Sequence, residues 1–263
     1  MSDRTGLGDR MKGYENITRF KLMRRTPTII RLDGKAFHTF TKGMERPFDT
    51  ILMEAMEQTM KNLCENIQGC VLGYTQSDEI TLVLVDYMNV DSCTWFDGNI
   101  QKITSVSSSM ATLFFNKNFR EILNKKRPYL NEGRINLLNS KIDKAMFDSR
   151  VFQLPKEEVV NCFIWRQQDA TRNSIQMLGQ ANFSHRELQN KNTSNIQDML
   201  VLERNINWNN LETKCKRGSC SIKENYVINE GTNKEAKRSR WIIDEQIPIF
   251  TQERSYIEKL ILI

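Results

Sequence analysis

The sequence predicts a mixed α/β (α+β) fold: an antiparallel sheet of the ferredoxin type with flanking helices, followed by a mainly helical C-terminal lobe. The hydrophobic patterns between residues 28 and 153 follow the order strand, helix, hairpin, helix, strand of a split βαβ layer. Composition agrees, because 263 residues with 39% hydrophobic and 27% charged side chains can bury a full core, as one large domain or two fused lobes.

The elements of this layer can be placed in chain order. A polar helix is expected over about residues 7–24, and a β-rich run predicts a strand over 28–32. A helix follows whose apolar stripe consists of Ile51, Leu52, Ala55, Met56, Met60, Leu63 and Ile67. Strands over 71–75 and 80–85 form a hairpin, and a second helix is expected over about 99–116. A strand over 149–153 completes the layer, and Pro155 opens a helix into the Trp165 region. This arrangement is also that of a polymerase palm.

Three further segments are expected outside the layer. The polar stretch 123–144 is interpreted as a connection between lobes. A helical pattern over 184–210 predicts the second lobe, and the apolar alternation over 241–250 predicts a late strand or a docked extended segment.

Two acidic turns are the most informative feature of the chain. Asp33 follows the first strand, and Asp78 lies in the hairpin turn with Glu79 beside it. Acids at the ends of adjacent strands can converge on divalent cations, and Mg²⁺ prefers hard oxygen ligands, so the pair predicts a site for two-metal phosphoryl chemistry. Gly34 leaves space for a close approach, and its carbonyl is a further candidate ligand. Taken alone, each motif is more often a plain turn.

Basic and polar residues surround these acids. Lys35, His38, Lys42 and Arg46 follow Gly34, and Lys102 lies on the second helix. Such cations can neutralise the remaining charge of a triphosphate. Ser77 is a candidate for phosphate contact or for orienting a ligand, although serine is also an ordinary turn residue. His38, between Phe37 and Phe40, is more often a packing or hydrogen-bonding residue than a base.

The overall charge favours a polyanionic partner. The net charge is +6 and the pI near 9.0. Two basic clusters, near Trp208 and Trp241, contain Lys214, Lys216 and Arg217, then Lys234, Lys237, Arg238 and Arg240. Clusters of this kind suit phosphate contacts with stacking on exposed bases, and a solvated basic surface is an equal alternative.

Cysteine usage and hydropathy suggest the compartment. The six cysteines form no CxxC pair, and Cys215 and Cys220 lack two nearby ligands that a zinc site would need. No stretch has the roughly 20 apolar residues that span a bilayer, and no apolar signal core is found, so reduced thiols and a cytoplasmic protein are expected.

In this order, the motifs RLDGKAFHTF, RPFD, YTQSDEITLVL, FIWRQQDATRNSIQMLGQ and INWNNL resemble the tRNA-histidine guanylyltransferase superfamily of 3′-to-5′ nucleotide polymerases. The resemblance extends from about Met11 to Pro248. It implies a palm with two Mg²⁺ ions, ATP or GTP as activating substrate, and a nucleotide 3′ hydroxyl that attacks the activated 5′ end of an RNA. It also implies tRNA and nucleoside triphosphates as partners and a homotetramer built from dimers.

The resemblance assigns roles to residues of this chain. Asp33, Asp78 and the Gly34 carbonyl are expected to hold the metal ions, with Asp33, Asp78 and Glu79 as the catalytic acids. Nucleotide contacts are expected from Asp33, Gly34, Lys35, Ala36, Phe37, His38, Ser77 and Asp78, and triphosphate contacts from Arg46 and Lys102. Residues 1–135 would form the catalytic palm, and residues 136–263 would complete it and add a helical, basic tRNA-binding region.

One departure concerns the subtype. Where eukaryotic guanylyltransferases carry His-Ile-Asn-Asn, this chain has Thr171-Arg172-Asn173-Ser174, and Gly98-Asn99 replaces the basic pair before Lys102. Both differences resemble the guanylyltransferase-like branch that repairs truncated tRNA 5′ ends against the opposite strand. The alternatives are a guanylyltransferase that adds the extra G to histidine tRNA, a non-catalytic tRNA-binding protein, and a nucleotide cyclase or cyclic-dinucleotide synthase.

Overall fold

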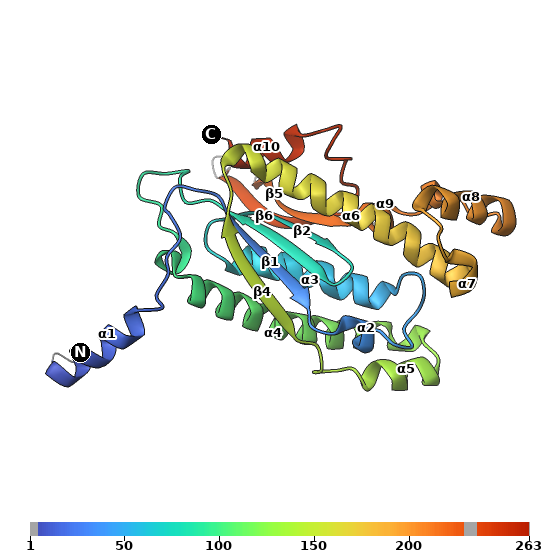
Figure 1. Cartoon of the computed structure of the whole chain (residues 1–263), viewed down its shortest axis with the longest axis horizontal. Helices are drawn as coiled ribbons and strands as arrows, with labels where there is room; N and C mark the ends of the chain where they lie inside the picture. The colour runs from blue at the N-terminus through green and yellow to red at the C-terminus, as the bar shows by residue number, and fades with distance from the viewer. Residues whose placement is uncertain (1–4, 229–235, 263) are drawn as a thin grey trace.

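The computed structural model describes residues 5–228 and 236–262. Its centre is a six-stranded sheet in the order β4-β1-β3-β2-β5-β6, in which every pair is antiparallel (Figure 1). The strands are β1 (Thr28–Gly34), β2 (Cys70–Gln76), β3 (Glu79–Leu84), β4 (Phe147–Gln153), β5 (Ser219–Ile228) and β6 (Ala236–Asp244). The order of the first four strands is that of a ferredoxin-type layer, which confirms the predicted fold class.

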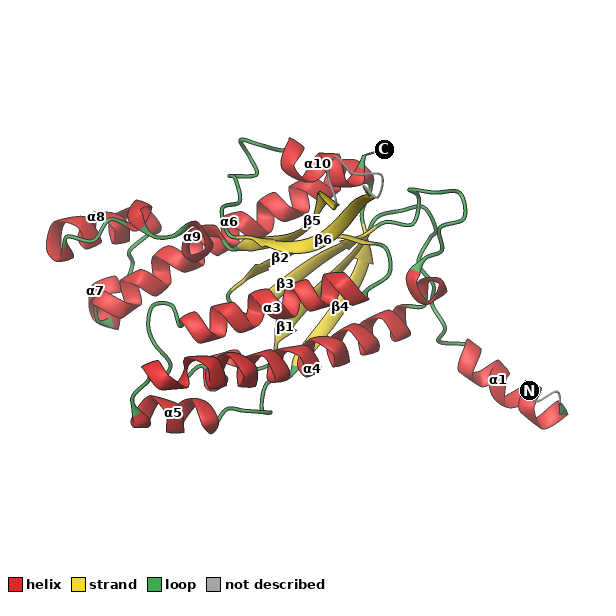
Figure 2. Cartoon of the chain, turned by 180° about the vertical axis from the view of Figure 1, so that it is seen from behind, coloured by secondary structure: helices red, strands yellow, loops and turns green. Residues whose placement is uncertain are grey.

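Helices cover both faces of the sheet (Figures 1 and 2). α3 (Thr50–Asn66) and α4 (Ile100–Lys126) pack on one face, and α6 (Lys156–Asn182) and α10 (Ser255–Ile261) pack on the other. Because side chains alternate along a strand, Ile30 and Leu32 point to the α3 and α4 side and Ile29 points to the α6 side. The two layers therefore form two apolar cores that share the central strands.

Short helices complete the chain: α1 (Gly6–Asn16), α2 (Phe37–Phe40), α5 (Glu132–Asn139), α7 (His185–Leu188), α8 (Thr193–Arg204) and α9 (Thr213–Arg217). Three 3₁₀ turns lie at Trp95–Gly98, Arg127–Tyr129 and Trp208–Asn210. The predicted lobe over 184–210 is present as α7 and α8, whose Ile196 and Leu200 pack against Ile175 and Leu178 of α6. α6 is 27 residues long and joins this lobe to the sheet.

The structure differs from the predictions in four features. The first helix ends at Asn16 rather than near residue 24. The interpretation of 123–144 as a connection between lobes was wrong, because Leu123 at the end of α4 and Leu138 in α5 are buried in the α3 and α4 core. β5 was not predicted. The expected boundary near residue 135 falls inside α5, and β4, β5 and β6 join the same sheet as β1.

Candidate functional site

The structure brings the two predicted acids together at one end of the sheet. Asp33 lies near the end of β1, and Asp78 lies in the β2–β3 turn. The Gly34 backbone N–H donates to the Asp78 carbonyl oxygen at 3.0 Å, which ties this turn to the end of β1. Asp33 is opposite Glu79 on β3 and opposite Asp148 on β4, so four acids meet around one strand end.

The electrostatics of Asp33 and Asp78 fit a bound cation. Burial raises the pKa of Asp78, and the neighbouring Asp33 raises it further. Burial also raises the pKa of Asp33, together with Asp148, while Arg150, Arg31 and Arg166 lower it. Hydrogen bonds from its own backbone and from Ser77 lower the pKa of Asp78, and no cation of the described residues is among the groups that shift it.

The available ligands suit magnesium. Among the described residues, no three His, Cys, Asp or Glu side chains gather into a metal-binding group. Asp33 and Asp78 are the two carboxylates that could hold a cation here, with the Gly34 carbonyl as a further candidate, and Mg²⁺ is commonly held by one or two carboxylates together with substrate phosphates and waters.

Glu79 lies beside these acids but faces other partners. Its carboxylate accepts two hydrogen bonds from Nη1 of Arg166, at 2.9 and 3.2 Å, and lies 3.8 Å from Nε of Arg31. Burial raises the pKa of Glu79, while Arg166 and then Arg31 lower it. The structure thus places Glu79, which was expected among the catalytic acids, as the anchor of two arginines.

The turn after β1 is shaped by Gly34. A Cβ at this position would lie 2.3 Å from Cδ2 of Phe37, so only glycine fits without displacing that ring. Phe37 is buried against Phe40, Phe115 and Phe147 and cannot reach a ligand through its ring. Ala36 adopts a left-handed conformation with φ of 54°. The exposed residues of the turn are Lys35, Ala36 and His38.

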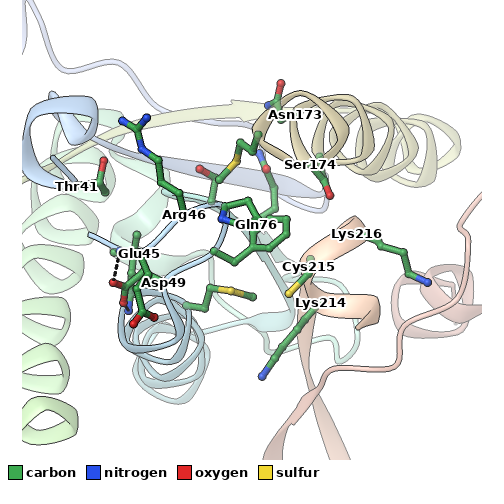
Figure 3. A pocket seen from close by; sticks show the side chains of 18 of the residues that line it. Thr41, Glu45, Arg46, Asp49, Gln76, Asn173, Ser174, Lys214, Cys215 and Lys216 are labelled. Carbon is green, nitrogen blue, oxygen red and sulfur yellow. Dashed lines mark hydrogen bonds between the residues drawn. The ribbon is translucent and has the colours of Figure 1, made fainter. Parts of the chain in front are cut away.

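A cavity of about 390 Å³ opens at the β2–β3 turn (Figure 3), and neither Asp33 nor Asp78 lines it. His38, Ser77 and Gln76 line its edge nearest the β2–β3 turn. Ser77 also donates from its hydroxyl to Oδ1 of Asp78 at 3.1 Å, so the cavity and the carboxylate pair are contiguous. The other walls come from the segment 41–53 and from α6 and α9, which contribute Ala170, Asn173, Ser174, Met177, Gln180, Lys214, Cys215, Lys216 and Arg217.

Arg46 is the cation best placed in this cavity. Its guanidinium makes no hydrogen bond or ion pair within residues 5–228 and 236–262, and Figure 3 shows the side chain extending toward the side of the cavity between Thr41 and Asn173. Its loop is held by Asp49, which accepts from the Glu45 backbone N–H at 3.1 Å and from Nη2 of Arg134 at 2.9 Å. Arg134 belongs to α5, which lies in the stretch 123–144 that was predicted to connect two lobes. Part of this stretch therefore supports the cavity.

Lys102 does not join this site within one chain. It lies in the first turn of α4, next to Ile103, which lines a small cavity with Thr26 and Thr28. Thr28 begins β1, and Asp33 is five residues further on, about 17 Å at 3.3 Å per residue. The contact of Lys102 with the triphosphate therefore stays a prediction that this geometry does not favour, because Lys102 does not line the cavity and its neighbour Ile103 lies near the start of β1.

The stacking of Trp208 and Trp241 on exposed bases stays a prediction, and both rings are half-buried in this structure. Nε1 of Trp208 donates to the Ser174 hydroxyl at 2.9 Å, and Trp241 packs against the α3 and α4 core. Nζ of Lys216 donates to the Asn209 carbonyl at 2.6 Å. Lys214 pairs with Glu245 at 3.2 Å.

The second basic cluster lies on β6. Lys237 and Arg238 are exposed, and Nη2 of Arg240 pairs with Glu224 at 2.7 Å. Lys234 lies outside the described residues.

The features that sequence reasoning missed are Asp148, Arg31, Arg150 and Arg166. Their strand positions could have indicated the first three, because Arg31 and Asp33 lie two residues apart on one face of β1. The motif FIWRQQD contained Arg166, but its buried partner could not be read from the sequence.

The comparisons with known proteins agree on one family. A family model described as Thg1, tRNAHis guanylyltransferase, matches residues 8–155, more than half of the chain. An uncharacterised protein of Acanthamoeba polyphaga mimivirus is 28% identical over 97% of this chain and 87% of its own length. A probable tRNA(His) guanylyltransferase of Dictyostelium discoideum is 26% identical over 91% of this chain and 93% of its own.

Two solved structures are similar over almost the whole chain. A bacterial tRNA(His) guanylyltransferase (Thg1)-like protein in complex with ATP has 45% identity and a TM-score of 0.81, covering 97% of this chain and 99% of its own. A structure described in the same words with GTP has 43% identity and a TM-score of 0.80, covering 98% and 100%. Within the described residues, no helix has both the length and the hydropathy to cross a lipid bilayer.

Proposed function

The chain belongs to the tRNAHis guanylyltransferase family and is a nucleotidyltransferase, and from this premise we propose that it extends truncated tRNA 5′ ends in the 3′-to-5′ direction, with the opposite strand as template. ATP or GTP would activate the 5′ end. The 3′ hydroxyl of an incoming nucleotide would then attack it and release the activating group.

The observation that carries this proposal is the place of Asn173 and Ser174. Both line the cavity beside the acids, in the segment where guanylyltransferases of histidine tRNA carry His-Ile-Asn-Asn. The cavity thus contains the very segment that departs from those enzymes. The two bacterial guanylyltransferase-like proteins, described with ATP and with GTP, support the same branch and suggest that this pocket accepts either purine nucleotide.

We infer a separate role for each residue of the site from its position. Asp33, Asp78 and the Gly34 carbonyl would hold Mg²⁺, which when bound would neutralise triphosphate charge. Arg46 would bind phosphate oxygens through charge-assisted hydrogen bonds. Ser77 orients the Asp78 carboxylate, and His38 lies at the cavity edge, where it can contact the nucleotide.

The deciding experiment changes the template. A tRNA that lacks its first nucleotide is incubated with the protein, Mg²⁺ and each nucleoside triphosphate in turn, with each of the four bases at the opposite acceptor position. We expect the complementary nucleotide to be added in each case, because a mismatch costs about 1–3 kcal/mol per position in nucleic-acid complexes.

A second candidate is the addition of the extra G to histidine tRNA, which is favoured by the names of the family and of its curated relatives. In the same assay this activity would add G whatever the template base, and only to histidine tRNA. The family resemblance also leads us to propose tRNA as the substrate and a homotetramer as the assembly.

A further inference from the structure

Trp165 is an exposed aromatic side chain next to the carboxylates. It lies on α6 and is 47% exposed, whereas the neighbouring Phe163 is fully buried in the core. It does not line the 390 Å³ cavity. Neither the core nor the nucleotide pocket therefore accounts for a large indole at this position.

The indole is held against a rigid support. The guanidinium carbon of Arg166 lies 3.6 Å from the centre of the Trp165 ring, and that of Arg31 lies 5.6 Å from it. Arg166 is only 5% exposed and is fixed by its two hydrogen bonds to Glu79. One face of the indole is therefore backed by an immobile cation, so little rotamer freedom would be lost when a ligand stacks on the exposed part.

The two arginines that contact Trp165 also lie close to Asp33. Arg31 and Asp33 lie on the same face of β1, and Arg31 and Arg166 both act on the pKa of Asp33. Beside them, Arg150 of β4 has an exposed side chain. In Figure 1 the parts of β1 and β4 below α6 face the viewer with no helix in front of them.

The cavity and Trp165 lie on different stretches of α6. Ala170 and Asn173, which line the cavity, follow Trp165 by five and eight residues, roughly 8 and 12 Å along a helix. Addition of a nucleotide to an RNA end requires that the nucleotide and the RNA end both lie at the carboxylates. The cavity suits the small nucleotide, and the exposed side with Trp165 and Arg150 suits the end of a polymer.

We propose that Trp165 is a binding residue on which the 5′-terminal base of the RNA acceptor stacks, opposite the nucleotide in the cavity. Exposed aromatics beside arginines are the usual platform for unpaired bases, because every base has a π-face. This inference rests on the proposed function, and it adds the site of the acceptor strand.

The test separates RNA binding from nucleotide use. W165A should raise the KM for an acceptor-stem hairpin by roughly five- to a hundredfold and leave the KM for ATP and GTP unchanged. W165F should retain most of the wild-type affinity, and W165L, which keeps an apolar side chain without a π-face, should not. Y129A removes an aromatic that is 88% exposed elsewhere and should change neither constant.

A second measurement does not depend on activity. The hairpin carries 2-aminopurine as its 5′-terminal base, and its fluorescence is followed on addition of protein without nucleoside triphosphates. Quenching by the wild type that W165A abolishes supports stacking, even if the wild type adds no nucleotide and the proposed function fails. An unchanged KM for the hairpin in W165A, a raised KM for ATP and GTP instead, or equal behaviour of W165L and W165F would overturn the inference.

Discussion

Asp33 and Asp78 are the residues on which the proposed chemistry depends most. D33N and D78N should each abolish nucleotide addition, because each removes a negative ligand from the metal site. The fold should persist, since neither side chain belongs to an apolar core. Circular dichroism together with the template assay checks both statements, and near-normal addition by either variant with Mg²⁺ would remove that acid from the site.

The same two acids predict how stability depends on pH. Their pKa values are raised in the folded protein, so in the acid range the folded state binds more protons than the unfolded state. Without Mg²⁺ the melting temperature should therefore fall as the pH rises from about 4 through the folded pKa values, and at neutral pH D78N should be at least as stable as the wild type. Mg²⁺ should restore the wild-type value and leave D78N unaffected.

Arg46 offers a matched comparison with Lys102. R46Q should raise the KM for ATP or GTP about ten- to a hundredfold, as expected for the loss of a charge-assisted hydrogen bond worth about 1.5–3 kcal/mol. The KM for RNA should stay the same. Lys102 lies on α4 near the start of β1, whereas Asp33 lies near the end of that strand. K102Q should therefore have no effect on nucleotide use. If K102Q shows the larger defect, the cavity is not where the triphosphate binds.

At the scale of elements, the buried ion pair between β3 and α6 is the critical connection. E79Q leaves the buried Arg166 with only Asp169 as an anion, 3.4 Å away, and should lower the free energy of unfolding by as much as about 3–5 kcal/mol. The exposed pair of Glu224 and Arg240 provides the control, because E224Q should cost less than about 1 kcal/mol. Urea unfolding of both variants gives the comparison. Equal, small losses would mean that Glu79 does not anchor α6.

Sequence reasoning located elements whose pattern is local and missed those that depend on pairing. The stripe from Ile51 to Ile67 and the acids of the two turns were recognisable, because periodicity and turn chemistry reside in neighbouring residues. β5 carries alternating polar residues and is placed by its bonds to β2 and β6 and by the burial of Cys220 in the core. The same limit applies to the site: the contacts of Glu79 with Arg166 and of Trp208 with Ser174 join residues 87 and 34 positions apart.

At the scale of the whole molecule, α1 stands away from the sheet and its helices (Figure 1). None of its residues is buried, and Leu7, Met11 and Tyr14, at helical spacing, are 59%, 45% and 65% exposed. If the proposed homotetramer forms, this apolar stripe is a natural contact between subunits. Replacing the three residues by serine should reduce the assembly size in sedimentation experiments and leave the circular dichroism of the body intact. An unchanged assembly would assign the contact to another surface.

Because β6 is an edge strand, its basic residues have a second role besides any contact with RNA. An edge strand presents unpaired backbone groups that can template growth by other chains, and charged side chains are a common protection against it. β6 ends the sheet, with Lys237, Arg238 and Arg240 along it. Neutralising these residues to test RNA contacts would therefore also expose the molecule to aggregation, and a loss of activity in such variants would report on solubility as much as on recognition.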